Sequence, residues 1–160
     1  MRKRSKYKPK GVRYDTMAYV KSGMLPVGSV PEAGVILKAK NHAAMDEILQ
    51  GRGTKDHVDV LIGMVNIAEA LAQDKELGSD WKDEIRTAQD ALLEMAVRGI
   101  KRGAFVFTGP ELQAVNLALD IHDEQLSKCP VKRLEQALGL VHDVIKHKRA
   151  RRIIDHPELA

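Results

Sequence analysis

Apolar residues recur at steps of three and four along most of the chain after residue 38, as on one face of an α-helix. This spacing predicts five helices, over about residues 38–50, 55–77, 79–102, 110–127 and from 130 into the C-terminal segment. No stretch shows the sustained alternation of a β-strand. Because the loops between the last four helices are short, consecutive helices are expected to pack antiparallel. The predicted fold is therefore all-α, an antiparallel helical bundle of about five helices with an extended basic N-terminal arm.

Residues that start and stop helices support these boundaries. Thr54 and Ser79 stand where an N-cap hydroxyl is expected, and Pro110 and Pro130 suit the first turns of the last two helices. The predicted helix ends are followed by glycines, namely Gly51, Gly78 and Gly103. The apolar run at residues 35–37 is too short to assign to a helix or an extended segment.

The predicted core is mostly aliphatic, because aromatic residues make up only 4% of the chain. Trp81, Phe105 and Phe107 are its expected large anchors. Two helices keep an a/d spacing, at Trp81, Ile85, Ala88, Leu92 and Met95, and at Val131, Leu134, Leu138, Val141 and Ile145. His42 and His122 fall near apolar faces, where a histidine is more often a hydrogen-bonded core residue than a ligand. Asn66, among apolar neighbours, is expected to pair with His42 or a backbone group.

Proline and glycine punctuate the first 33 residues, which are therefore predicted to be non-helical. All three tyrosines lie in this stretch. Tyr14 and Tyr19 are expected to pin the arm to the bundle, whereas Tyr7 is free to stack on a base. The predicted organisation is an arm at 1–33, a helical bundle at 34–150 and a C-terminal tail at 151–160.

Charge is distributed very unevenly along the chain, although the net charge is only +4. Residues 1–13 hold seven cations and no acid, and residues 146–160 hold five cations and two acids. Residues 14–145 hold fourteen cations and twenty acids. An acidic body thus lies between two basic ends, and basic ends of this kind bind nucleic acid by releasing counterions, or serve only as solubilising tails.

The first functional hypothesis is a non-enzymatic protein that associates with nucleic acid through these ends. Lysine and arginine contacts to phosphates give affinity without sequence readout, and no helix-turn-helix is evident. The bundle would supply shape or form a homodimer. The expected contacts are Arg2, Lys3, Arg4, Lys6, Tyr7, Lys8, Lys10, Lys146, Lys148, Arg149, Arg151 and Arg152.

The alternative hypothesis is an inhibitor that binds a bacterial host factor, such as a defence or transcription component, through the acidic surface of the bundle. Acidic residues cluster around the turn between the second and third predicted helices. They are Asp74, Glu76, Asp80, Asp83 and Glu84. The plain interpretation of such a cluster is a solvated helix end.

Catalytic motifs are not evident in the sequence. The Glu-x-x-His spacing of di-metal bundles does not occur, and His142 and His147 point in different directions on a helix. Cys129, before Pro130, is expected to be a partly buried thiol rather than a nucleophile. The turn at Gly51–Gly53 is a weak anion site, and no phosphate-binding loop occurs. We expect no metal, no cofactor and no enzymatic activity.

Three stretches carry a resemblance to known sequences, residues 1–9 (MRKRSKYKP), 40–45 (KNHAAM) and 61–71 (LIGMVNIAEAL). They resemble small uncharacterised proteins of bacteriophages, prophages and plasmids, over about the first half of the chain. The resemblance implies a bacterial host cytoplasm and a role in a mobile element's dealings with host machinery. A single cysteine and the lack of any long apolar run agree with the cytoplasm and with no membrane partner.

Overall fold

The computed structural model describes residues 23–27, 31–147, 149 and 156–159. Within them lie five α-helices, α2 (Pro31–Leu49), α3 (Lys55–Leu71), α4 (Lys82–Arg102), α5 (Gly109–Lys128) and α6 (Val131–Lys146). Three short 3₁₀ helices accompany them, η2 (Lys75–Leu77), η3 (Ser79–Trp81) and η5 (Pro157–Leu159). No strand occurs among these residues, and the predicted all-α class is confirmed.

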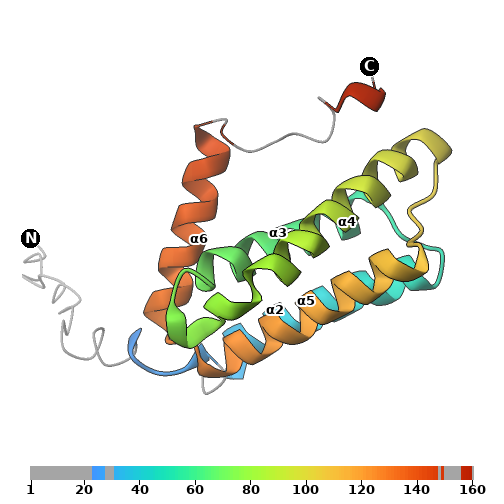
Figure 1. The fold of residues 1–160 in the computed structure, drawn as a ribbon. Helices are drawn as coiled ribbons and strands as arrows, with labels where there is room; N and C mark the ends of the chain where they lie inside the picture. Colours follow the sequence, from blue (N-terminus) through green and yellow to red (C-terminus); the bar gives the residue numbers. More distant parts are fainter. Residues whose placement is uncertain (1–22, 28–30, 148, 150–155, 160) are drawn as a thin grey trace, which may run out of the picture.

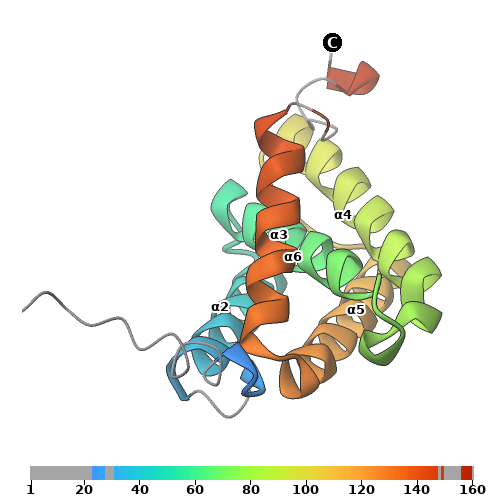
Figure 2. The same cartoon turned by 90° about the vertical axis from the view of Figure 1, so that its left-hand side faces the viewer.

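The first four helices run alternately up and down and pack side by side as antiparallel neighbours (Figure 1). The last helix departs from this order. α6 packs mainly against α3 rather than α5, and Figure 2 shows it in front of α3. Figure 1 shows it rising at one side of the bundle, at a steep angle to the other helices. Its first half is therefore covered by other helices, whereas its second half stands beside the bundle.

Two main apolar clusters hold these helices together, beside a third that consists only of Ala68, Ala72, Ile85 and Ile121. The larger one lies between α2, α3, α4 and α5, and its fully buried side chains include Leu61, Met64, Leu92, Met95 and Val115. The smaller one lies under the first half of α6, where Leu71, Leu77 and Leu126 meet Leu134 and Ala137. Because the second cluster reaches only as far as Ala137, it fixes the base of α6 but not its outer half.

The short segment before α2 is tied to the start of α6. The N–H of Val27 donates to the carbonyl of Cys129 at 2.7 Å, and the N–H of Val131 donates to the carbonyl of Leu25 at 2.9 Å. Val27 is fully buried in the smaller cluster. The described chain therefore begins beside the first turn of α6.

Local hydrogen bonds explain where several helices begin and end. Thr54 precedes α3 as predicted, and its N–H donates to Nδ1 of His57. Glu111 accepts the N–H of Thr108 at 2.8 Å, and this closes a capping box at the start of α5. The same carboxylate accepts hydrogen bonds from both terminal nitrogens of Arg98. These bonds lower the pKa of Glu111 and raise the pKa of Arg98. This pair links the end of α4 to the start of α5.

Three of the predicted helix boundaries are wrong. The first helix begins at Pro31, inside the stretch predicted to be non-helical. The second ends at Leu71 rather than near 77, because Asp74 accepts the N–H of Glu76 and caps a separate 3₁₀ turn. Ser79 is not the N-cap of α4, since it starts a further 3₁₀ turn and donates to Asp80.

Three of the predicted core residues are exposed. Trp81 is 45% exposed, because the 3₁₀ turn before α4 rotates it away from the a/d face. Leu138 is 42% exposed and Ile145 is 59% exposed, because α6 diverges from the bundle beyond Ala137. Phe105 and Phe107 are partly buried against the larger cluster, as anchors should be.

Gly99, near the end of α4, is expected to tolerate no side chain. A Cβ at this position would overlap the ring of Phe105. We expect Gly99→Ala to lower the free energy of unfolding by about 1–3 kcal/mol, because the ring must leave its place. Thermal melting of this variant beside Gly139→Ala, which meets nothing within 4 Å, tests the expectation, and equal melting temperatures would contradict it.

Candidate functional site

Most of the predicted nucleic-acid contacts lie outside the described residues. These are the seven positions from Arg2 to Lys10, together with Lys148, Arg151 and Arg152. Lys146 and Arg149 are described, and both are exposed at the end of α6. Neither side chain makes an ion pair with another residue of the described part. They are therefore available to an anionic partner.

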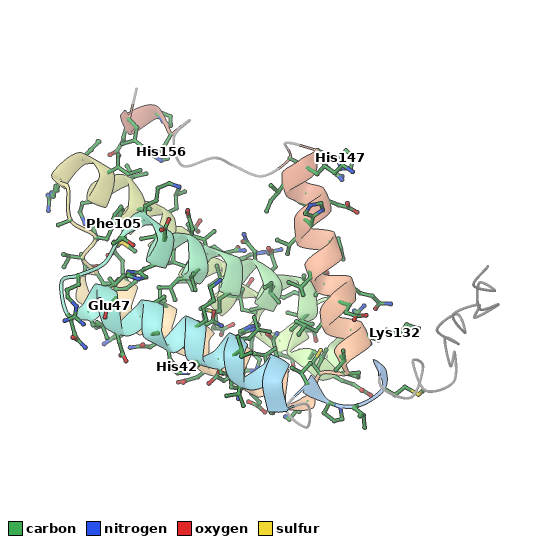
Figure 3. The ribbon with its side chains drawn as sticks, turned by 180° about the vertical axis from the view of Figure 1, so that it is seen from behind. His42, Glu47, Phe105, Lys132, His147 and His156 are labelled. Atoms are coloured by element: carbon green, nitrogen blue, oxygen red, sulfur yellow. The ribbon has the colours of Figure 1, made fainter. Side chains whose placement is uncertain are left out.

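The described chain begins at Gly23, beside the first turn of α6, and the C-terminal basic segment begins in the last turn of the same helix. A Cβ on Gly23 would lie 3.4 Å from Cβ of Lys132, in the first turn of α6. The C-terminal basic segment begins in the last turn, at Lys146. Figure 3 shows Lys132 and His147 at opposite ends of this helix. The 16 residues of α6 span about 24 Å, the length of roughly seven base pairs.

The C-terminal segment is anchored again beyond its basic stretch. Lys101, in the last turn of α4, lies 2.8 Å from Oε2 of Glu158. η5 contacts α4 there. Arg102 is exposed beside this anchor. The last turns of α4 and of α6 each carry cations, where the helix dipole favours them.

The five acids of the alternative hypothesis have different surroundings in the structure. Asp74 caps η2 and lies 3.5 Å from Nε of Arg133. One carboxylate oxygen of Glu84 is buried. Asp83 is exposed and lies 3.9 Å from Arg86. Only two of the five, Glu76 and Asp80, share a concavity.

That concavity is a hollow of about 210 Å³ at the turn between α3 and α4. Trp81 lines it together with Glu76 and Asp80, and α5 adds Glu124 and Lys128. Lys128 bonds Glu124, which lowers the pKa of that carboxyl. The sequence did not reveal that Trp81 is exposed or that Glu124 lies beside it, because the two are far apart along the chain.

A larger groove of about 630 Å³ lies between α3, α4 and α6. Its outer wall is the free half of α6, with Leu140, Val141, Val144 and Ile145. The opposite wall includes Leu93 of α4. The groove exists because α6 diverges from the bundle. The predicted a/d spacing concealed it by assigning Val141 and Ile145, two residues of this wall, to the core.

Polar side chains form the floor of this groove. The Gln89 amide donates to Oδ1 of Asn66 at 3.1 Å and to Oε2 of Glu69 at 2.9 Å. Arg86 lies 3.6 Å from the other oxygen of Glu69. Asn66 thus pairs with Gln89 and not with His42 or a backbone group, and the earlier expectation is wrong. Asp90 also lines the groove and makes no ion pair with any described residue.

Two histidines and the cysteine of the bundle have surroundings that favour a structural role over a catalytic one. His122 is fully buried, and burial lowers its pKa from 6.5 to about 4. His42 is exposed rather than in the core, because Asp123 holds it at 2.9 Å on the surface. Burial raises the pKa of Cys129 to about 11, so its thiol is protonated at neutral pH and is a poor nucleophile.

The described part of the chain contains neither a cluster of metal ligands nor a membrane-spanning helix. No three His, Cys, Asp or Glu side chains there converge as ligands of a metal ion would. None of the helices in the same residues is both long enough and apolar enough to cross a bilayer.

Comparison of the chain with protein-family models, with curated proteins and with solved structures finds no match in any of the three. The chemistry of the molecule must therefore be argued from its own residues. Three surfaces stand out, the basic ends joined by α6, the hollow around Trp81 and the groove beside α6.

Proposed function

We propose that this chain is a non-enzymatic protein that binds nucleic acid through its basic ends, with α6 as the rigid strut between them. The observation that carries the proposal is the position of both chain exits on α6, at Gly23 beside Lys132 and at Lys146. Seven cations precede one exit and five follow the other. Basic segments that leave the described chain about 24 Å apart can contact phosphates roughly seven base pairs apart on one duplex.

The excess of acids between residues 14 and 145 also supports binding of nucleic acid at the two ends of the chain. Acids outnumber cations between residues 14 and 145, by twenty to fourteen. A polyanion is thus attracted to the ends of the chain and repelled by the turn that holds Asp80 and Asp83.

The lysines of the arm should determine affinity for nucleic acid. We expect Lys6, Lys8 and Lys10, replaced together by alanine, to weaken binding to a labelled duplex at low salt at least about tenfold, because three phosphate contacts are lost. The melting temperature should not change. Fluorescence anisotropy with duplex DNA and with RNA measures the effect.

A matched control removes the same charge from the acidic body. Lys40, Lys75 and Lys82 make no ion pair with any described residue, and their replacement by alanine changes the net charge equally. This variant should bind about as well as the parent chain. If both triple variants lose the same affinity for the duplex, the effect is one of net charge, and this result would contradict a role for the arm.

A second candidate function is the binding of a bacterial host protein at the hollow around Trp81. A tryptophan exposed at 45% and flanked by Glu76, Asp80 and Glu124 supports it, since tryptophan is enriched among residues that dominate interfaces. Capture from nuclease-treated bacterial lysate by the parent and by Leu117→Ala, but not by Trp81→Ala, is the expected result. Equal capture by all three would contradict it.

The setting of either function is proposed from the resemblance to proteins of phages, prophages and plasmids. That resemblance supports action in the cytoplasm of a bacterial host. Both candidate functions need only a folded bundle and its surface charges, without a cofactor.

A further inference from the structure

We propose that the groove between α3, α4 and α6 is a self-association surface that receives α6 of a second copy of this chain. The starting observation is the unpartnered apolar side of α6. Leu140 is 54% exposed and Ile145 is 59% exposed, and both line the groove. Val141 and Val144 lie between them and are only half-buried.

The apolar surface is wider than the groove itself. Leu138 is exposed although it is not part of the groove lining, and Met24 and Leu25 are exposed on the segment paired with the first turn of α6. Five of the twelve large exposed apolar side chains of the described residues therefore lie on α6 or beside its start. A surface this extended fits a helix of a macromolecular partner better than a small molecule, which a pocket usually encloses.

Charge identifies a second copy as the occupant. Two acids line the groove. Asp90 has no ion-pair partner among the described residues, whereas Glu69 accepts a hydrogen bond from Gln89 and forms an ion pair with Arg86. An amphipathic helix with an apolar stripe and a free cation at its end would complement them. α6 is such a helix, since its stripe is open and Lys132 in its first turn is exposed and unpaired within the described part of the chain.

Two-fold symmetry makes the arrangement self-complementary. In such a dimer each contact occurs twice, so the stripe of one α6 covers the stripe of the other and fills the partner's groove. The divergence of α6 from the bundle then has a packing reason, because the apolar side chains that α3 leaves uncovered become buried between the two copies.

Sedimentation velocity of the full chain over a concentration series tests this inference. We expect a species of about twice 17.8 kDa. The double variant Leu140→Asp/Ile145→Asp should raise the dissociation constant at least tenfold while the circular dichroism melt stays cooperative. The matched control is Leu117→Asp, on α5 and 40% exposed outside the groove, and it should leave the dimer intact.

Two results would overturn the inference. One is a parent chain that stays monomeric at every concentration. The other is a dimer that the double variant leaves unchanged, which would place the interface elsewhere. Both are independent of the proposed function, because binding of a duplex by the arm lysines can be measured whether the chain is a monomer or a dimer.

Discussion

Leu92→Asp is expected to abolish cooperative folding. Leu92 is fully buried in the larger cluster, among side chains of α2, α3, α4 and α5. The substitution removes the burial of an aliphatic side chain and leaves a carboxylate without a partner, which together cost about 5 kcal/mol or more. Because most domains are stable by only about 5–15 kcal/mol, the circular dichroism spectrum should lose helicity and the thermal transition should vanish.

Leu138→Asp is the matched control for this prediction. The a/d spacing assigns Leu92 and Leu138 to equivalent core positions, but Leu138 is 42% exposed on the free half of α6. A carboxylate there stays in water, so the variant should melt cooperatively near the temperature of the parent. A chain that unfolds with Leu138→Asp but survives Leu92→Asp would contradict the core described above.

The stability of the protein should fall as the pH is lowered from 7 to 4. Burial lowers the pKa of His122 from 6.5 to about 4, with Lys38 lowering it further and Gln125 and Asp123 opposing the shift. Between these two pH values the unfolded chain binds a proton at this residue that the folded chain does not. The free energy of unfolding should therefore drop by about 3 kcal/mol over this range and change no further at His122 below it.

Denaturant titrations at a series of pH values measure this loss. In the parent, the free energy of unfolding should drop by about 3 kcal/mol between pH 6.5 and 4 because of His122. His122→Gln should remove this drop. His142, which is exposed on α6, supplies the control, because His142→Gln should show the same drop as the parent. If the two variants and the parent show the same pH dependence, His122 does not titrate as its burial requires.

The class of the fold and most of the core could be predicted from the sequence. The periodic residues of four helices, such as Leu61, Leu92 and Val115, are buried as their spacing predicts. The helix ends were harder to predict, because they depend on whether local side-chain hydrogen bonds end a helix, which periodicity does not show. Asp74 ends α3 early by capping a 3₁₀ turn, and Pro31 starts α2 in a region that its glycines and prolines suggested was extended.

The surfaces were harder to predict than the core. Amphipathic spacing shows that one side of α6 is apolar, but it cannot show that another helix covers only half of that side. The groove beside Leu140 and the exposure of Trp81 both depend on how helices cross. The charge asymmetry was visible from the sequence alone, whereas the positions of Gly23 and Lys146 at opposite ends of α6 needed the structure.

The dependence of nucleic-acid affinity on salt tests the proposed function most directly. The parent chain should bind duplex DNA with an affinity that falls steeply as salt rises, because each phosphate contact releases counterions. Replacing Lys6, Lys8 and Lys10 with alanine should flatten the slope of log affinity against log salt by about 2–3 units. A parent chain that does not bind at low salt, or a triple variant with an unchanged slope, would contradict the proposal.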